Sequence, residues 1–400
     1  MYKFINNGTV TSANGFKAAG IFCGIKKKKK DLALIYSTQS CTSAGTFTLN
    51  KVKAAPLLIS QEVIKSDNMI NAVLVNSGNA NACTGEEGYN NAKLMQSVCA
   101  EKLNIKPENV LISSTGVIGQ QMPMQNLLNG INNIVPFISA DGGHDAAEAI
   151  LTTDTKQKSF AVKVEIGKET FTIGGICKGS GMIMPNMATM LAFITTDAKV
   201  EKSLLQKILF NAVDISFNKI SVDGETSTND MVTIMANGVS GVEINTPGKE
   251  EEFQKALNAV SIEMAKSIIS DGEGATKLIT INVTGANTKT DADLVGKSLS
   301  NSPLLKTAIY GEDANWGRIM SSAGMSGAEF TPEKVTIKFD DHAVLLPDYN
   351  IVVDELIASK ILAKKELNIN INLNGGKFSS TWWTCDFTEN YIKINANYRT

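Results

Sequence analysis

The stretch KGSGMIMPNMATMLAFITT, residues 178–196, carries the strongest signal in this sequence. Two glycines and Pro185 favour a tight, irregular backbone, and Ala188 then places a small residue before the hydroxyl of Thr189. Attack of that hydroxyl on the preceding carbonyl would form an ester, and water would cleave it to leave Thr189 as a new N-terminus. An α-amine has an unperturbed pKa of about 7.7–8.0, so it can act as the base for its own hydroxyl.

A second interpretation of the same stretch stays open on spacing alone. Methionine-rich apolar segments most often belong to a hydrophobic core. The nucleophile hypothesis therefore needs support from the rest of the chain.

The flanking patterns predict a layered fold. Residues 159–166 and 169–176 alternate polar and apolar side chains, which predicts an antiparallel hairpin turning at Gly167. A helix is expected over 86–103, opened by a capping box of Thr84 and Glu87. Further helices are expected at 123–134, 145–151, 200–217, 251–270 and 292–301. Hairpins mixed with long helices predict an α/β or α+β fold with layered sheets.

The domain organisation is less sharply marked. The chain has 400 residues, which is enough for two domains. Residues 286–293 either join a main body, 1–285, to a smaller C-terminal region, 286–400, or form a loop before the next helix.

Composition excludes several classes of protein. The net charge of −2 gives no electrostatic signature of a nucleic-acid binder. Pro185, Asn186 and Thr189 interrupt the apolar stretch 182–196, so no transmembrane helix is expected, and the N-terminus lacks the apolar block of a signal peptide. The six cysteines form no CxxC pair, which indicates reduced thiols in a cytoplasmic protein.

Residues that are scarce or oddly grouped exclude further chemistry. The two histidines, His144 and His342, lie beside no recognisable nucleophile motif, and no cysteine–histidine cluster suggests zinc. The carboxylates at 340, 341 and 348 are most simply a solvated loop, and no phosphate-binding glycine motif occurs. The lysine run 26–30 is expected to be a solvated hairpin turn. The two arginines, Arg318 and Arg399, are either specific ion-pair partners or structural residues.

The motif KGSGMIMPNMATM resembles the cleavage and nucleophile motif of the ornithine acetyltransferase family, self-processing N-terminal-nucleophile enzymes of arginine biosynthesis. Seven further segments resemble that family in the same order, over essentially the whole chain. They are SGNANACTG (77–85), STGVIG (114–119), LTTDT (151–155), VDGETSTND (222–230), DGEGATK (271–277), GEDANWGRI (311–319) and INANYRT (394–400).

The resemblance implies a fold and a set of residue roles. The fold would be a layered αββα sandwich of the N-terminal-nucleophile type with a smaller C-terminal α/β region, whose tail returns to the active site. Cleavage between Ala188 and Thr189 would give an α chain, 1–188, and a β chain, 189–400. Thr115 and Gly116 would form the oxyanion hole through a hydroxyl and a backbone N–H. Substrate contacts would fall on Thr152, Lys178, Thr189, Glu273, Asn395 and Thr400.

Some of these assignments stay open. Thr153 or Thr155 could replace Thr152 as the substrate contact. Lys178 would hold the α-carboxylate that ornithine and glutamate share, whereas Glu273 would meet the ornithine ammonium or handle protons. The resemblance is not used to assign a catalytic role to either arginine.

The implied reaction moves an acetyl group from N2-acetyl-L-ornithine to L-glutamate through an acetyl-threonine intermediate. The resemblance implies no metal or cofactor, and an α2β2 assembly. The motifs do not separate enzymes that also use acetyl-CoA from those that do not, and feedback inhibition is not readable. Two alternatives remain: a self-processing amidase or aminopeptidase that passes the acyl group to water, and a catalytically silent binding protein of this fold.

Overall fold

The computed structural model describes residues 1–184 and 190–397. The chain divides into two compact units, which are described separately. The first unit comprises residues 1–179, 185–218 and 226–268, and the second comprises 180–184, 219–225 and 269–400.

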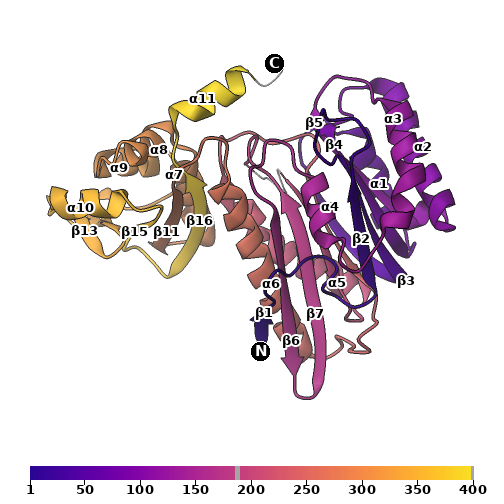
Figure 1. Ribbon diagram of the computed structural model, residues 1–400. Helices are drawn as coiled ribbons and strands as arrows, with labels where there is room; N and C mark the ends of the chain where they lie inside the picture. The colour runs from indigo at the N-terminus through magenta and orange to yellow at the C-terminus, as the bar shows by residue number, and fades with distance from the viewer. Residues whose placement is uncertain (185–189, 398–400) are drawn as a thin grey trace. The chain divides into compact units, whose positions relative to one another are not determined.

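The first unit is built on one hydrogen-bonded sheet in the order β1-β6-β7-β8-β10-β3-β4-β5, with β2 paired to β3 (Figure 1). Its strands are β1 (Tyr2–Phe4), β2 (Phe16–Ile21), β3 (Leu32–Phe47), β4 (Ile70–Asn79), β5 (Val110–Val117), β6 (Lys158–Ile166), β7 (Glu169–Lys178), β8 (Leu191–Thr196) and β10 (Met231–Ala236). Its helices are α1 (Ala55–Lys65), α2 (Gly85–Leu103), α3 (Met124–Ile134), α4 (Gly143–Ala149), α5 (Lys202–Asp214) and α6 (Pro247–Ser270).

The long strand β3 belongs to two parts of this sheet. Its residues 32–37 pair with β2 and β4, whereas its residues 42–47 pair with β10. We call β2, β4, β5 and the first part of β3 the first leaf, and β1, β6, β7, β8, β10 and the last part of β3 the second leaf. One core cluster joins Val73 and Val75 of the first leaf to Phe193 and Met231 of the second, so the two leaves pack face to face.

Helices cover the outer face of each leaf. Leu34 and Leu74 of the first leaf pack with Met95 of α2 and Ile131 of α3. On the second leaf, Phe171 of β7 stacks on Phe253 of α6 with ring centroids 5.6 Å apart. The order of layers is thus helices, sheet, sheet, helices, which confirms the predicted αββα sandwich. Strands β8 and β10 of the second leaf are buried along their whole length, as expected for strands covered on both faces.

The second unit has its own sheet, in the order β14-β13-β12-β15-β11-β16-β9. Its strands are β9 (Ile220–Ser221), β11 (Leu278–Ala286), β12 (Thr336–Phe339), β13 (His342–Leu346), β14 (Asn350–Ile351), β15 (Glu366–Asn372) and β16 (Phe378–Cys385). Its helices are α7 (Lys289–Asn301), α8 (Pro303–Tyr310), α9 (Trp316–Gly324), α10 (Glu355–Leu362) and α11 (Glu389–Ala396). Val295 and Leu299 of α7 share a core with Ile281 and Val283 of β11, as expected for a smaller α/β region.

The division between the units falls earlier than residue 286. Strand β11 pairs with β15 on one side and β16 on the other, so it lies inside the second sheet. A boundary at 286 would separate β11 from both partners. Residues 286–293 are therefore the end of β11, a short loop and the start of α7, rather than a linker between units.

Two local predictions are corrected. Helix α2 begins as expected, but Thr84 does not cap it, since its hydroxyl donates to Asn81 Oδ1 at 2.7 Å. The lysine run does form a turn, with exposed side chains at 27–29, yet Lys26 is half-buried. Its ammonium donates to the carbonyl of Leu151 at 2.9 Å.

The structure also describes several other residues that the sequence singled out. All six cysteines are free thiols. Arg318 donates from Nη1 to the carbonyl of Leu304 at 2.7 Å, which is a structural contact, whereas Arg399 lies outside the described residues. Asp340 forms an ion pair with Lys364 at 2.7 Å. Within residues 1–184 and 190–397, no group of His, Cys, Asp and Glu is arranged to hold a metal.

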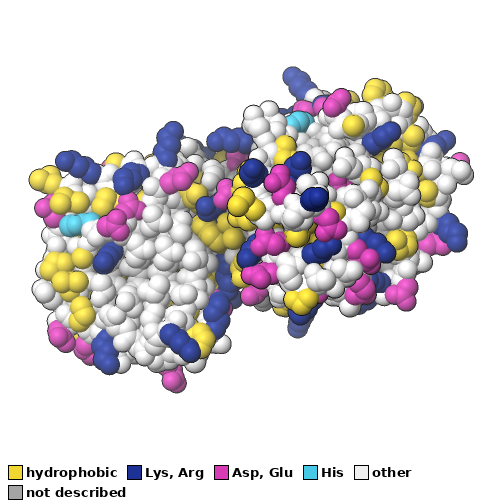
Figure 2. Space-filling model, turned by 90° about the horizontal axis from the view of Figure 1, so that it is seen from below, with side chains coloured by type: hydrophobic (Ala, Val, Ile, Leu, Met, Phe, Trp, Pro, Cys, Tyr) yellow, Lys and Arg dark blue, Asp and Glu magenta, His cyan; other side chains and the backbone are white. Residues whose placement is uncertain are grey.

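The surface agrees with the small net charge. Figure 2 shows basic and acidic side chains interspersed over one face of the molecule, without a large area of a single sign. No described helix is long and apolar enough to cross a membrane.

Candidate active site

The candidate site residues are distributed over both units. Thr115, Gly116, Thr152 and Lys178 belong to the first unit, and Glu273 and Asn395 belong to the second. Ala188, Thr189 and Thr400, the predicted cleavage pair and the terminal contact, lie outside the described residues.

The predicted oxyanion segment lies at the end of β5. Gly116 has φ +135°, a conformation that L side chains rarely adopt, and a Cβ there would lie 2.3 Å from the carbonyl carbon of Gly78. The parallel ladder to β4 becomes irregular at this point, with Asn79 facing both Thr115 and Val117. Thr115 is 9% exposed, and no hydrogen bond to its hydroxyl is formed within residues 1–184 and 190–397. A free hydroxyl and a glycine backbone at one turn are groups suited to an oxyanion hole.

Asn229 ties this segment to the second leaf. Its side-chain amide is 5% exposed and donates to the carbonyls of Ser114 and Ala80, each at 2.7 Å. Its own Oδ1 accepts a hydrogen bond from the Thr228 hydroxyl at 2.5 Å, which orients the amide. Because Asn229 directly precedes Asp230 and β10, it links the start of β10 to the residue before Thr115.

The start of β8 is aligned with its neighbours. Leu191, the first residue of β8 and two residues after Thr189, pairs with Lys178 on one side and with Met231 on the other. The N–H of Met231 also donates to the carbonyl of Met190 at 3.0 Å. The chain that follows the predicted nucleophile is therefore fixed between the end of β7 and the start of β10.

A buried charge cluster supports Lys178. Asp154 accepts hydrogen bonds from Lys158 Nζ at 2.8 Å, from the Gly179 N–H at 2.7 Å and from the Thr152 N–H at 3.0 Å. The side chains of Asp154 and Lys158 are both fully buried. Burial alone would raise the pKa of Asp154, but the charges of Lys178 and Lys158 and its hydrogen bonds hold that pKa well below its usual range.

Lys178 is the more loosely held cation of this cluster. It is 8% exposed, and its ammonium lies 4.0 Å from Asp154 Oδ2, which already accepts from Thr152. No hydrogen bond to the Lys178 ammonium is formed within the described parts of the chain. A nearly buried ammonium without a hydrogen bond is unfavourable unless an anion joins it. The Thr152 N–H and the Lys178 ammonium thus share Asp154 as a partner.

Asp230 is a second buried acid near the start of β10. It is 2% exposed, and its Oδ2 is buried with no hydrogen-bond partner in the described structure. Burial raises the pKa of Asp230 well above its usual range, against the opposing effects of Ser227 and the charge of Lys178. The charge of Lys178 therefore acts on Asp230 as well as on Asp154.

The second unit brings together Glu273 and Asn395. The amide of Asn395, on α11, donates to Glu273 Oε2 at 2.9 Å, and Glu273 itself is 7% exposed. The Glu273 N–H donates to the carbonyl of Ser180 at 2.9 Å. A Cβ on Gly181 would lie 2.4 Å from the Glu273 carboxylate, so glycine is required beside it. Two polar residues that are far apart in the sequence thus meet next to the glycine-rich stretch.

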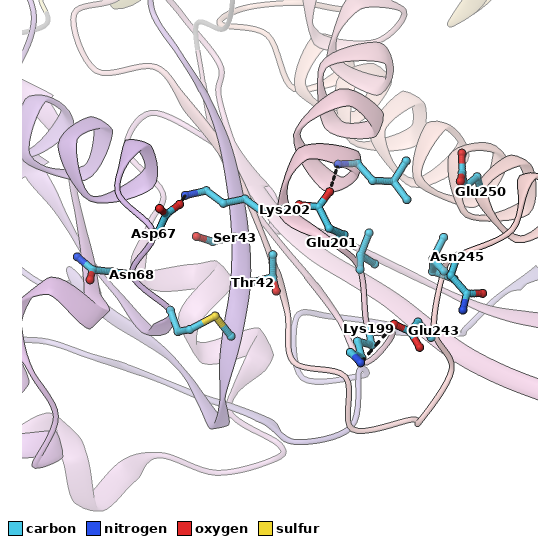
Figure 3. Close-up of a pocket in the computed structure, with 14 residues that line it drawn as sticks. Thr42, Ser43, Asp67, Asn68, Lys199, Glu201, Lys202, Glu243, Asn245 and Glu250 are labelled. Carbon is cyan, nitrogen blue, oxygen red and sulfur yellow. Dashed lines mark hydrogen bonds and ion pairs between the residues drawn. The ribbon is translucent and has the colours of Figure 1, made fainter.

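A pocket of about 620 Å³ occurs elsewhere in the first unit. It lies beyond the other end of β8, where Lys199, Glu201 and Lys202 follow the strand (Figure 3). Lys199 pairs with Glu243 at 3.2 Å, and Glu201 caps α5 by accepting from two backbone N–H groups. These charges already have local partners, so we do not assign the reaction to this pocket.

Sequence reasoning missed three residues that shape the site. Asp154 and Asn229 stood within recognised motifs, but a sequence does not reveal which polar side chains turn inward. Lys158 carried no signal, because a lysine at the start of a strand is ordinarily solvated.

Comparison with known proteins gives one family. The ArgJ family model matches residues 17–400. The arginine biosynthesis bifunctional protein ArgJ 1 of Clostridium acetobutylicum is 48% identical over 99% of this chain and 99% of its own. The arginine biosynthesis bifunctional protein ArgJ of Thermotoga neapolitana is 48% identical over 96% of this chain and 99% of its own.

A solved structure was also found. A crystal structure of the arginine biosynthesis bifunctional protein ArgJ of Bacillus halodurans is 46% identical and has a TM-score of 0.46, and the match covers 47% of this chain and 98% of that one.

Proposed function

Because this chain belongs to the ArgJ family, we propose that it transfers the acetyl group of N2-acetyl-L-ornithine to L-glutamate, giving ornithine and N-acetylglutamate. Family membership confirms the resemblance found in the motifs. The curated relatives are named as arginine biosynthesis proteins, and the proposal places this chain in the same pathway.

One observation carries the proposal more than any other. Asn229 ties the oxyanion segment, at Thr115 and Gly116, to the start of β10, and β10 is paired with the strand that begins two residues after Thr189. A nucleophile and an oxyanion hole must be held in fixed relation for acyl transfer. The link that Asn229 makes between the two leaves supports the proposal for this reason.

The first half-reaction forms an acetyl-enzyme. In the proposal, self-cleavage frees the Thr189 amine, and this amine takes the proton of the Thr189 hydroxyl as the oxygen attacks the acetyl carbonyl. The negative charge of the tetrahedral intermediate is stabilised by the Thr115 hydroxyl and the Gly116 N–H. The intermediate collapses by breaking the C–N bond, and the proton passes to the departing amine. Ornithine is released, and the acetyl group remains as an ester on Thr189.

The second half-reaction reverses these steps with glutamate. The α-amine of glutamate attacks the ester carbonyl, and the Thr189 oxygen departs with a proton from that amine. Lys178 binds the α-carboxylate of both substrates, with Thr152 beside it. The family resemblance also assigns substrate contacts to Glu273, Asn395 and Thr400, with Glu273 receiving the ornithine ammonium.

The proposal needs no metal or cofactor, because a hydroxyl, an amine and fixed hydrogen-bond donors supply every step. We also propose an α2β2 assembly of processed chains in the cytoplasm. Acetyl-CoA, if it serves as a second donor, would acetylate the same Thr189.

A hydrolytic amidase is the alternative function, since it uses the same nucleophile but a water acceptor. Product analysis separates the two: N-acetylglutamate indicates transfer, and free acetate indicates hydrolysis.

Steady-state kinetics test the proposed order of events. Since both substrates use one site in turn, initial rates measured over a grid of N2-acetylornithine and glutamate concentrations should give parallel double-reciprocal lines. Intersecting lines would mean that both substrates bind together, which would contradict an acetyl-enzyme in this pocket.

Replacing Asn229 tests the link to the oxyanion segment. Asn229→Asp removes the two N–H donors to the Ser114 and Ala80 carbonyls, so we expect kcat to fall by about 10–100-fold, below the loss typical of removing an oxyanion donor outright. The matched control is Asn237→Asp, because the Asn237 amide donates to the Asn14 carbonyl at 2.8 Å just after the other end of β10. Equal kcat values for the two processed variants would refute the role of Asn229.

A further inference from the structure

Lys26 differs from the lysines that follow it. The side chains of residues 27–29 are exposed, whereas Lys26 is half-buried and donates from Nζ to the carbonyl of Leu151 at 2.9 Å. Leu151 directly precedes Thr152, whose N–H donates to Asp154. The ammonium of Lys26 thus lies at the segment that supports Lys178.

The stem of Lys26 packs against Gly78, beside the predicted oxyanion segment. A Cβ on Gly78 would lie 3.0 Å from Lys26 Cγ, and Gly78 is paired with Gly116. Lys26 therefore contacts Gly78, the strand partner of Gly116, with its stem and Leu151, the residue before Thr152, with its ammonium. These are two of the segments that form the candidate site in the first unit.

The backbone holds Lys26 firmly while its charge stays available. Asp31, which is fully buried, accepts hydrogen bonds from the backbone N–H groups of Cys23, Gly24, Ile25 and Lys26. This fixes the turn, and it uses the Asp31 oxygens on N–H groups rather than on the Lys26 ammonium. No carboxylate forms an ion pair with Lys26 in the described residues.

Partial burial leaves the Lys26 ammonium incompletely solvated. Burial lowers the pKa of Lys26 to about 8, with a further small effect of Lys29, although Asp31, Asp154 and Glu148 act in the opposite direction. The ammonium is thus mostly charged at neutral pH but incompletely solvated. A carboxylate that joined it would relieve this cost.

The proposed reaction requires a group of this kind. Ornithine and glutamate share an α-amino group and an α-carboxylate, but the ornithine side chain ends in an ammonium and the glutamate side chain ends in a carboxylate. In the proposed function, Lys178 binds the α-carboxylate that both substrates share. Glu273 is negatively charged and can bind only the ornithine ammonium. A second cation is needed for the acceptor.

We propose that Lys26 binds the side-chain carboxylate of glutamate and so selects the acetyl acceptor. This inference rests on the proposed acetyl transfer and adds a subsite to it. The ammonium keeps its hydrogen bond to the Leu151 carbonyl and donates its remaining N–H groups to the carboxylate.

The test compares Lys26→Met with Lys28→Met, a control that removes an exposed charge from the same run. Each processed variant is assayed with glutamate, with glutamine as a neutral acceptor, and in the first half-reaction with N2-acetylornithine alone. For Lys26→Met we expect the KM for glutamate to rise about 10–100-fold, as for loss of a charged hydrogen bond. The preference for glutamate over glutamine should disappear, and enzyme acetylation by N2-acetylornithine should change less than 3-fold (about 0.6 kcal/mol).

The outcomes separate this subsite from the proposed function. If the unaltered protein forms no N-acetylglutamate, the proposed function fails. If it does, and Lys26→Met keeps the glutamate KM of Lys28→Met, only the subsite is refuted. A loss that is equal for glutamate, glutamine and N2-acetylornithine would also refute it, because that pattern indicates damage to the oxyanion turn. Lys26→Arg, which keeps the charge, should restore part of the preference for glutamate if Lys26→Met is poorly folded.

Discussion

Thr189→Ala should abolish acetyl transfer, with a loss of about 10⁴-fold or more in kcat, because the variant lacks the atom that accepts the acetyl group. The same substitution removes the hydroxyl needed for self-cleavage. No α-amine would then be released to act as a base. The expected result is a chain that forms neither an acetyl-enzyme nor N-acetylglutamate.

The control for this variant is Thr189→Ser, which keeps a hydroxyl at the same position. It should retain cleavage and measurable transfer. Both are followed by chromatography of N-acetylglutamate and by mass spectrometry of the protein after exposure to N2-acetylornithine. Transfer by Thr189→Ala at the rate of the unaltered protein would exclude Thr189 as the nucleophile.

Asp154→Asn should cost about 3–5 kcal/mol of unfolding free energy, because it leaves the Lys158 ammonium buried without its counter-charge. The pKa of Asp154 is lowered in the folded state, so its contribution is present above its ordinary pKa. That contribution is lost only as the pH falls toward the lowered folded-state value. The full loss of unfolding free energy should therefore be seen at neutral pH, where denaturant unfolding of the variant measures it.

Two further variants make this test specific. Glu243→Gln breaks the exposed pair with Lys199, and we expect a cost of about 1 kcal/mol or less. Combining Asp154→Asn with Lys158→Met removes both buried charges and should recover much of the loss. Equal midpoints for Asp154→Asn and Glu243→Gln would show that the buried pair does not stabilise the fold.

The alternating strands were the most predictable part of the fold. The hairpin of β6 and β7 turns at Gly167 as expected, because period-two alternation and a glycine with positive φ are local signals. The ends of α2 were also predictable, but its cap was not. Thr84 can donate to Asn81 only because the loop before the helix folds back, and no local pattern encodes that choice.

The division into units depends on contacts that are distant in sequence. Residues 180–184 and 219–225 join the second unit although the sequence on either side of them belongs to the first. Strand β11 lies between β15 and β16, which come much later in the chain. The segment 286–293, which the sequence analysis considered as a joining segment, gives no information about such pairing.

The candidate site was predictable as motifs but not as geometry. The matched motifs assigned roles to Thr115, Gly116, Lys178 and Glu273, and these roles stay predictions. The sequence offered no means of seeing that Asp154 is shared by Thr152, Lys158 and Gly179, or that Asn229 connects two leaves. The charged run 26–30 predicted that the Lys26 side chain would be exposed. Its partial burial instead comes from packing against Gly78, which is distant in sequence.

The most direct test of the account is the covalent state of the freshly purified protein, measured by intact mass and N-terminal sequencing. We expect two polypeptides, residues 1–188 and 189–400, with the second beginning at Thr189. A single uncut chain of 42.8 kDa that still transfers acetyl groups would contradict it, because the N-terminal amine would then have no part in the reaction.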